Sequence, residues 1–257
     1  MSKYKIISWN VNGFRSILTK GIDEFIEKEN PNILGLQEIK VQENQLKKLP
    51  QCFNNYHAIY NSAERKGYSG VATFSNKKTK DFKIGINIDE FDIEGRVIES
   101  AYDDFRLFNI YFPNGKKDSI RLDYKMKFFK ELMLYLKNLL YKGEKIIVMG
   151  DFNIAHFAID LKRPDANSNI SGFLPQERKV MDDFIDLGFI DSFRYFHKEP
   201  DNYTWWDPIS HARDRNVGWR IDYIMISRNL ENNLLESTIY NKVYGSDHCP
   251  IGCYLKF

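Results

Sequence analysis

The segment from residue 145 to residue 153 reads Lys-Ile-Ile-Val-Met-Gly-Asp-Phe-Asn. Its apolar part is typical of a buried strand, and the glycine that follows marks the end of that strand. Asp151 and Asn153 come next at alternate positions, so both side chains point to one side of an extended chain. Open α/β sheets bind their ligands beyond such strand ends. The segment therefore predicts an α/β fold with a polar site at the end of this strand.

Similar chemistry adjoins other strand-like runs. The polar segments are Trp9-Asn10-Val11-Asn12-Gly13, Leu36-Gln37-Glu38 and Gly245-Ser246-Asp247-His248. Carboxylates and amides without clustered Cys or paired His favour a hard cation, Mg²⁺ with Mn²⁺ as a substitute, over zinc. Magnesium needs only one or two protein carboxylates beside a substrate phosphate, so Glu38 with Asp247 and Asn10 would suffice. The sequence predicts an oxygen-rich pocket for such an ion and a phosphate.

Two groups of residues are candidates for proton transfer. The Asp151 carboxylate beside the Asn153 amide suits proton transfer together with stabilisation of phosphorane oxygens. The same pair also fits an Asp-containing turn followed by an Asn helix cap, and these residues alone leave both interpretations open. His248, with Asp222 on a neighbouring predicted strand, suggests an Asp–His pair in which the carboxylate fixes the tautomer of the imidazole.

The composition is that of an ordinary globular protein. The chain has 257 residues, 43% of them hydrophobic, and a formal net charge of +2. This length fits one domain covering residues 1–257, which we expect to be a monomer. The small net charge does not indicate a nucleic-acid partner, although a local basic face is compatible with it.

The cysteines and the hydropathy indicate the cellular compartment of the protein. Cys52, Cys249 and Cys253 form neither an even disulfide framework nor a metal-ligand spacing, so we expect free thiols in a reducing compartment. No signal-peptide hydrophobic region follows the first residues, and no apolar run has membrane-spanning length. We therefore expect a cytoplasmic protein, or a nuclear one in a eukaryotic cell, with no membrane partner.

The hydrophobic pattern predicts alternating strands and helices. Strands are expected at residues 5–9, 33–36, 56–60, 71–75, 98–102, 105–111, 145–149, 219–227 and 251–257. Helices are expected at residues 17–28, over a long amphipathic segment after residue 115, and at residues 175–187. The segments 5–10 and 145–153 look alike, which hints at two similar halves, each with its own sheet.

Motifs along the whole chain resemble those of one enzyme family, the exonuclease III-type apurinic/apyrimidinic endonucleases of the endonuclease/exonuclease/phosphatase superfamily. Besides the segments above, the matching motifs are Gly67-Tyr68-Ser69-Gly70-Val71, Tyr111-Phe112-Pro113-Asn114-Gly115, Ser171-Gly172-Phe173-Leu174-Pro175, Asn216-Val217-Gly218-Trp219-Arg220-Ile221-Asp222-Tyr223 and Gly245-Ser246-Asp247-His248-Cys249-Pro250. The Gly-Asp-Phe-Asn and Ser-Asp-His motifs mark the superfamily, and the others narrow it to the DNA-repair branch.

The resemblance implies a fold and an activity. The expected fold is a four-layer α/β sandwich, in which two packed mixed β-sheets lie between helices. The expected reaction is a Mg²⁺-dependent cut on the 5′ side of an abasic site in double-stranded DNA, leaving a 3′-hydroxyl. The sequence does not rank the accompanying activities, which are 3′→5′ exonuclease, 3′-end cleaning, RNase H, and incision beside a damaged or deaminated base.

By the same resemblance, Glu38 is the principal metal ligand, with Asn10, Asn12 and Asp247 near the metal. Asp151, Asn153 and His248 complete the set of candidate metal ligands. Asn12 stands where some members of the family have Asp, which removes one charge and leaves the number of ions, one or two, open.

The resemblance also implies roles in the reaction. Asp151 would prepare the attacking water or protonate the leaving oxygen. Asn153 and Tyr111 would stabilise the developing charge. His248, oriented by Asp222, would contact the scissile phosphate.

Contacts with DNA follow in the same way. The candidates for gripping the backbone are Arg15, Lys40, Tyr68, Asn114 and Asn169, and Lys125 is a further candidate for neutralising phosphates. Trp205 and Trp219, with Leu174 or Phe173, would wall an apolar pocket for a flipped-out deoxyribose. Lys117 and Ile209 would enter the duplex from its two grooves, although both are equally compatible with plain exposed loop residues.

Two other functions remain compatible with parts of the pattern. An inositol-phosphate phosphatase or a sphingomyelinase on the same scaffold would share Glu38, Asp151, Asn153 and His248, but has no use for residues 216–220 and the tryptophan pocket. A non-catalytic nucleic-acid-binding module would have lost at least one of those four side chains, and all four are present.

Overall fold

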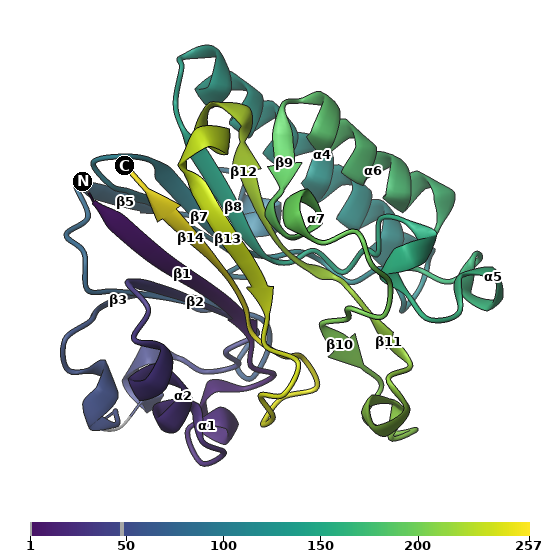
Figure 1. The fold of residues 1–257 in the computed structure, drawn as a ribbon, viewed down its shortest axis with the longest axis horizontal. Helices are drawn as coiled ribbons and strands as arrows, with labels where there is room; N and C mark the ends of the chain where they lie inside the picture. Colours follow the sequence, from purple (N-terminus) through teal and green to yellow (C-terminus); the bar gives the residue numbers. More distant parts are fainter. Residues whose placement is uncertain (1, 47–48) are drawn as a thin grey trace.

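Two six-stranded sheets pack face to face in the computed structural model, which describes residues 2–46 and 49–257 (Figure 1). Sheet A has the order β13 (Leu234–Ile239), β14 (Ile251–Lys256), β1 (Lys3–Asn10), β2 (Ile33–Gln37), β4 (Val71–Ser75) and β3 (His57–Asn61). Sheet B has the order β5 (Asp81–Ile84), β6 (Val97–Ala101), β7 (Arg106–Tyr111), β8 (Ile146–Asp151), β12 (Asp222–Ser227) and β9 (Phe189–Asp191). A separate two-stranded ribbon joins β10 (Trp205–Trp206) to β11 (Gly218–Trp219).

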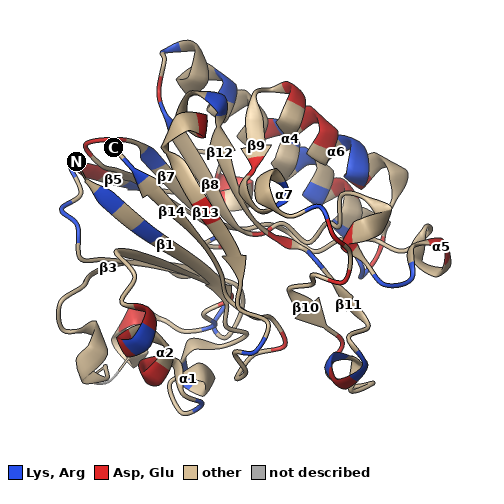
Figure 2. Cartoon of the chain, viewed as in Figure 1, with Lys and Arg blue, Asp and Glu red and all other residues tan. Residues whose placement is uncertain are grey.

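Helices cover the outer faces of both sheets. Sheet A is covered by α1 (Phe14–Ile17) and α2 (Ile22–Glu29), and sheet B by α4 (Ser119–Tyr141) and α6 (Pro175–Asp186). The shorter helices are α3 (Asp89–Asp92), α5 (Pro164–Asn167) and α7 (Ser192–Phe196), with 3-10 turns at Glu43–Gln45, Gln51–Phe53, Ala158–Asp160, Ala212–Arg215 and Arg228–Asn233. The predicted four-layer α/β sandwich is confirmed. Figure 2 shows acidic and basic residues along the outer helices α4 and α6, and basic residues on β1.

Three apolar layers hold the four structural layers together. Along β8, Ile146 and Val148 pack against α4 and α6, whereas Ile147 and Met149 pack between the sheets. This alternation follows from the two-residue period of a strand, and it explains why the whole segment is apolar: both faces of β8 are buried. A third layer, which includes Trp9, lies between sheet A and its helices.

The sheet topology brings the polar strand ends to one edge. β1 runs parallel to β2, and β7 runs parallel to β8, so within each sheet two carboxyl ends lie side by side. β12 runs antiparallel to β8, which places Asp222 at its start opposite Asp151 at the end of β8. The two look-alike segments form β1 and β8, and each belongs to its own sheet as the hint from the sequence suggested.

The helix predicted at residues 17–28 is wrong in its first part. The chain instead forms the short α1, then a turn, and α2 starts only at Ile22. The reason is Gly21, whose φ of 87° is left-handed and cannot continue a helix.

The single strand predicted at residues 219–227 is also wrong, because it is interrupted between β11 and β12. The amide of Arg220 donates to the Asp160 carbonyl at 2.7 Å, and the amide of Ile221 donates to the Thr204 hydroxyl at 3.0 Å. These two residues therefore leave the ladder and turn the chain from the ribbon into sheet B.

The two ends of the chain meet at the opposite edge of the molecule. The Phe257 amide donates to the Ser2 carbonyl at 2.9 Å, and Figure 1 shows the termini side by side. The three cysteines are free, as predicted, with Cys249 and Cys253 buried. Within residues 2–46 and 49–257, every helix is too short or too polar to cross a membrane.

Candidate active site

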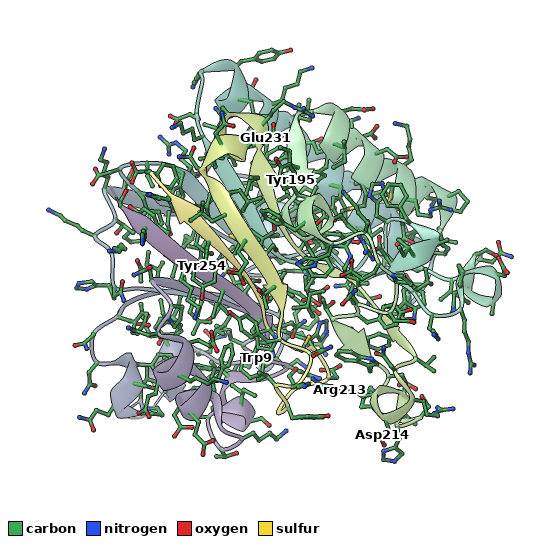
Figure 3. The ribbon with its side chains drawn as sticks, in the orientation of Figure 1. Trp9, Tyr195, Arg213, Asp214, Glu231 and Tyr254 are labelled. Atoms are coloured by element: carbon green, nitrogen blue, oxygen red, sulfur yellow. The ribbon has the colours of Figure 1, made fainter. Side chains whose placement is uncertain are left out.

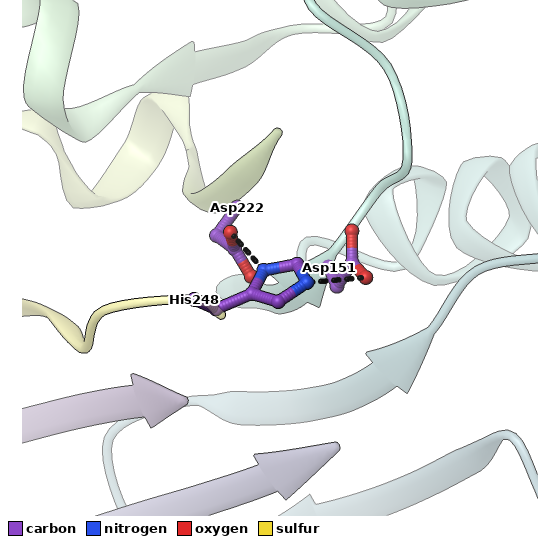
Figure 4. Close-up of side chains that lie close together, drawn as sticks. All are labelled: Asp151, Asp222 and His248. Atoms are coloured by element: carbon purple, nitrogen blue, oxygen red, sulfur yellow. Dashed lines mark hydrogen bonds and ion pairs between the residues drawn. The ribbon is translucent and has the colours of Figure 1, made fainter. Parts of the chain in front are cut away.

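A buried histidine lies between two carboxylates where the two sheets meet (Figure 4). His248 Nδ1 is 2.8 Å from Asp222 Oδ2, and His248 Nε2 is 3.8 Å from Asp151 Oδ2. All three side chains are almost fully buried. Asp151 ends β8 and Asp222 begins the adjacent β12, so the sheet register fixes their spacing. The Asp–His pair predicted from the sequence is thus formed, and Asp151 extends it into a line of three groups.

This line shifts the proton affinities of its members. Burial alone would lower the pKa of His248, but the carboxylates of Asp222 and Asp151 outweigh it and raise the pKa to about 10. Burial raises the pKa of Asp151 to about 7; the charge on His248 opposes this rise and that of Asp222 adds to it. The imidazole is therefore held protonated, and Asp151 can both accept and release a proton near neutral pH.

Neighbouring strands hold the line in place. The indole N–H of Trp9, which is labelled in Figure 3, donates to the His248 carbonyl at 3.1 Å. The Asn10 amide donates to Asp151 Oδ2 at 2.9 Å. Asp222 Oδ1 is buried and has no hydrogen-bond partner within residues 2–46 and 49–257. Asn10, at the end of β1 in sheet A, thus supplies a donor to the Asp151 carboxylate, which ends β8 in sheet B.

Asn153 lies directly beside Asp151 in a strained turn. Its φ is 54°, a left-handed value that Asn tolerates better than most residues. Its side-chain nitrogen Nδ2 donates to Asp151 Oδ2 at 3.2 Å and to the Phe112 carbonyl at 3.0 Å. Its side-chain oxygen accepts a hydrogen bond from Asn114 Nδ2 at 2.9 Å. Asn114, which the sequence had placed only on the DNA surface, is therefore hydrogen-bonded to the Asn153 turn.

A second group of oxygen ligands lies on the loops that follow β1 and β2. Asn12 Nδ2 donates to Asp247 Oδ1 at 2.9 Å, and Lys40 Nζ lies 2.9 Å from Glu38 Oε1. The same ammonium donates to Asn12 Oδ1 at 2.5 Å. Asn10 Oδ1 accepts a hydrogen bond from the backbone N–H of Asn12 at 3.0 Å. Because Asn10 also donates to Asp151, it joins this group to the line of Asp222, His248 and Asp151. The structure brings the predicted metal ligands together.

The donor set fits a hard cation. The oxygens of Glu38 and Asn12 already hold one positive charge, the Lys40 ammonium, at the place where an ion would bind. Burial would raise the pKa of Asp247, but nearby His248 and hydrogen bonds from Asn12 and Trp205 lower it, so this carboxylate stays ionised. Oxygen ligands of this kind suit Mg²⁺ or Mn²⁺.

A second arrangement of donors could also hold a metal ion. The ligand atoms of Asp151, Asp222 and His248 all lie within 4.8 Å of one another. A protonated imidazole has no free lone pair, however, and the raised pKa of His248 keeps it protonated in the free protein. The loop group with Glu38 is therefore the better candidate for the metal.

Tyr111, at the end of β7, faces the same area. Burial, reinforced by Glu38, raises the pKa of its hydroxyl well above the ordinary value, so it remains a hydrogen-bond donor. The Arg96 guanidinium lies 4.7 Å from the Tyr111 ring centroid.

Tyr68 belongs to a half-buried polar cluster on this side of the molecule. Its hydroxyl accepts hydrogen bonds from Arg96 and Arg121 at 3.0 and 2.9 Å, and both arginines also pair with Glu94. The cluster lines a hollow of about 730 Å³ that also includes Asn114 and Tyr111. Sequence reasoning missed Arg96, Arg121 and Glu94, because their mutual contacts join segments that no motif connects.

An apolar wall stands next to the candidate metal-ligand group. Trp205 and Trp219 pair across β10 and β11 and pack with Phe173 in one apolar cluster. The Trp205 indole N–H donates to Asp247 Oδ2 at 3.0 Å, which ties the wall to the loop group. Of the two alternatives Phe173 and Leu174, Phe173 belongs to this cluster. The missed neighbour is Lys116, whose ammonium lies 4.7 Å from the centroid of the Trp205 ring and 5.5 Å from that of Trp219.

One predicted DNA contact is wrong. The side chain of Lys125 is completely buried, and its ammonium pairs with Glu177 Oε1 at 2.5 Å and donates to the Asn153 carbonyl at 2.8 Å. Burial lowers the pKa of Lys125, although the pairing with Glu177 opposes this. Lys125 therefore supports the Asn153 turn from beneath and is not available to a DNA phosphate.

The remaining candidates lie on the surface. Arg15 and Asn169 are exposed, and Lys40 is half-buried against Glu38. Lys117 and Ile209 are among the most exposed side chains, at 84% and 90%. Their contacts with DNA stay predictions.

A comparison with models of protein families shows to which family the chain belongs. A model described as the endonuclease/exonuclease/phosphatase family matches residues 7–248. The chain belongs to this family. The match begins within β1 and ends at His248, so it includes both groups of site residues. The family is one of hydrolases, and the chain is accordingly an enzyme of the nuclease type.

Within this family, the chain is similar to proteins named as DNA nucleases. An exodeoxyribonuclease of Bacillus subtilis is 41% identical over 249 residues, which cover 96% of this chain and 97% of that protein. A DNA-(apurinic or apyrimidinic site) endonuclease of Dictyostelium discoideum is 42% identical over 257 residues, which cover 98% of this chain and 70% of that protein.

Solved structures of family members share the fold. A 3′ phosphatase from Neisseria, bound to a product DNA hairpin, superposes with a TM-score of 0.91 at 28% identity and covers 99% of this chain and 100% of that one. An AP endonuclease from Archaeoglobus fulgidus gives a TM-score of 0.88 at 28% identity with the same coverage.

Proposed function

We propose that this nuclease hydrolyses the phosphodiester bond on the 5′ side of an abasic nucleotide in double-stranded DNA and leaves a 3′-hydroxyl. Mg²⁺, or Mn²⁺ in its place, is the cofactor, and the same site performs 3′→5′ exonuclease and 3′-end-cleaning reactions. Residues 1–257 act as one nuclease domain and as a monomer. One observation carries the proposal: the hydrogen bond from Trp205 to Asp247 joins a metal-ligand group to an apolar wall beside a buried acid–base line.

Asp151 acts as the proton-transfer group. Its pKa of about 7 lets the carboxylate take a proton from the attacking water or give one to the leaving 3′ oxygen. Asn153 is fixed beside it, because its Nδ2 donates to Asp151 Oδ2 and to the Phe112 carbonyl. When the 3.2 Å bond to Asp151 is given up, one N–H of this amide becomes free to donate to a phosphate oxygen as charge develops. Tyr111, neutral because of its raised pKa, supplies a second donor.

His248 provides fixed positive charge. Asp222 holds its Nδ1, which leaves the Nε2 side free to face Asp151 and the scissile phosphate. An imidazolium in a water-poor site stabilises a developing phosphorane without needing to reorganise.

Glu38, Asp247, Asn12 and Asn10 would hold the metal ion. When bound, the ion supplies Lewis-acid stabilisation of a phosphate oxygen. Lys40 must then move from the oxygens of Glu38 and Asn12, which frees its ammonium for a DNA phosphate. Because Asn12 is uncharged, the group has two carboxylates, and these suffice for one magnesium ion.

Selection of the abasic site rests on the apolar wall. An abasic nucleotide has no base to unstack, so it leaves the helix at a lower cost than the few kcal/mol needed for an intact nucleotide. Trp205, Trp219 and Phe173 offer an apolar surface for its bare sugar, next to Asp247. Arg15, Lys40, Tyr68, Asn114 and Asn169 grip the backbone, while Lys117 and Ile209 enter the duplex.

The decisive experiment compares matched duplexes. We expect a duplex with one abasic site to be cut on its 5′ side in Mg²⁺ and left intact in EDTA. An undamaged duplex should be cut far more slowly, and duplexes with uracil or a 3′-phosphate rank the other activities. Glu38→Gln should lose activity and regain part of it at high Mg²⁺, because the charge that holds the ion is gone. Cleavage of phosphoinositides with no cut at the abasic site would instead support the phosphatase alternative.

A further inference from the structure

Lys116 occupies the face of the apolar wall. Its ammonium lies over both indole rings, at 4.7 Å from the centroid of Trp205 and 5.5 Å from that of Trp219. The residue stands in the loop between β7 and α4, whereas the rings come from the β10–β11 ribbon (Figure 1). The side chain therefore crosses from one segment to another to reach the surface on which we place the abasic sugar.

The backbone of Lys116 is fixed relative to the catalytic amide. Asn114 Oδ1 accepts the Lys116 backbone N–H at 2.8 Å, and Asn114 Nδ2 donates to Asn153 Oδ1 at 2.9 Å. The side chain of Asn114 thus links the backbone of Lys116 to the side chain of Asn153. A phosphate held by Asn153 would have the sugar of the same nucleotide within reach of this amine.

The amine of Lys116 is chemically unusual for an exposed residue. Within residues 2–46 and 49–257, no carboxylate lies within ion-pair distance of its Nζ, in contrast to Lys40 or Lys125. Loss of hydration next to the surrounding protein atoms lowers the pKa of Lys116, while the more distant charges of Asp151, Asp207 and Glu177 oppose this change. A lysine whose pKa is lowered spends more time as the neutral amine, which is the nucleophilic form.

We propose that Lys116 is a nucleophile that forms a covalent imine with the ring-opened aldehyde of the abasic sugar. This second, metal-independent reaction rests on the proposed function, because it needs an abasic nucleotide on the tryptophan wall. The substrate class is an aldehyde carried on DNA.

The reaction balances without any oxidant or reductant. The neutral Nζ attacks C1′ of the open-chain sugar, and a proton moves from nitrogen to the former carbonyl oxygen to give a carbinolamine. The hydroxyl then leaves as water together with the remaining proton of the nitrogen, which gives the C1′=Nζ imine. Hydrolysis reverses both steps and restores the free lysine and the aldehyde.

Borohydride trapping tests the proposal. The full chain is incubated in EDTA with a duplex that carries a natural abasic site, so that the strand stays intact, and sodium borohydride then reduces any imine to a stable amine. We expect a covalent protein–DNA adduct on a denaturing gel, with the modification mapped to Lys116 by peptide mass spectrometry. A duplex with a tetrahydrofuran analogue, which has no aldehyde, should give none.

Two lysine variants make the test specific. Lys116→Arg keeps the positive charge over the indoles but cannot form an imine, so the adduct should fall to the tetrahydrofuran background. Lys179→Arg changes an exposed lysine on α6 that pairs with Asp183, away from the tryptophan wall, and should retain the adduct. An undiminished adduct in Lys116→Arg overturns the proposal.

The inference and the proposed function can fail separately. Wild-type protein that cuts the abasic duplex in Mg²⁺ but gives no adduct in EDTA overturns the imine and leaves the proposed function standing. Protein that neither binds nor cuts that duplex overturns the proposed function itself.

Discussion

At the scale of single residues, the charge of His248 depends on Asp222. In metal-free protein the groups that face the imidazole are Asp222, Asp151 and Asp247, and together they raise its pKa from 6.5 to about 10 against the effect of burial. The imidazole should therefore stay protonated through neutral pH. In Asp222→Asn the largest stabilising charge is lost, so the pKa should fall and the ring should release its proton at a lower pH. Titration of the imidazole nitrogens by NMR measures both values, and a wild-type ring that titrates near 6.5 would contradict the assignment.

Sequence reasoning reached the residues that stand directly at strand ends. Asp151, Asn153, Glu38 and His248 could be recognised because their chemistry sits in short motifs next to apolar runs. Lys125 could not be judged in this way, since a lysine on an amphipathic helix is normally solvated, and its burial depends on a partner, Glu177, far along the chain. The position of Lys116 depends equally on tertiary structure, because only the fold brings its loop over the ribbon.

At the scale of elements, the end of β8 and the turn that carries Asp151 and Asn153 depend on Gly150. Its φ is 145°, and a Cβ at this position would lie 1.8 Å from the backbone carbonyl oxygen of Ile110 on β7. Gly150→Ala should therefore push β8 away from β7 and cost on the order of 1–3 kcal/mol in the free energy of unfolding from overpacking. Activity should fall as well, because Asp151 is the next residue.

A matched variant separates the clash from the backbone strain. Gly143 also has a left-handed φ, 79°, but a Cβ there would meet no atom within 4 Å. Gly143→Ala should lose only the backbone preference, about 1 kcal/mol. Denaturant unfolding of both variants provides the comparison, and equal losses would mean that the contact with Ile110 relaxes freely.

Strands that are buried on both faces were the easiest to predict. Strands such as β2, β4 and β8 are buried on both faces, so their apolar runs mark them directly. The edge strand β13 was missed, because only part of it is buried and it carries Glu236 and other polar residues that fit a loop equally well. The break before β12 depends on hydrogen bonds to Asp160 and Thr204, which no local pattern reveals.

At the scale of the whole molecule, a net charge of +2 is compatible with electrostatic binding of DNA. Each phosphate that the protein neutralises should contribute about 0.9 to the slope of log affinity against log salt. Arg15→Ala and Lys117→Ala should each reduce that slope by about 0.9 if they contact phosphates. Lys179→Ala, on α6 and paired with Asp183, is the matched control and should leave the slope unchanged. A slope that none of these variants changes would argue against a basic DNA face.

The meeting of the chain ends offers a practical opportunity. Ser2 and Phe257 are already joined by a hydrogen bond, at the edge of the sandwich opposite the strand ends that carry the site. A short peptide linker could close the chain into a ring, and new ends could be opened at the exposed turn near Lys78 without cutting a strand. Fluorophores, surface tethers or fusion partners attached at either position would extend away from bound DNA. The same scaffold could thus serve as an immobilised sensor of DNA damage whose reading face stays open to solution.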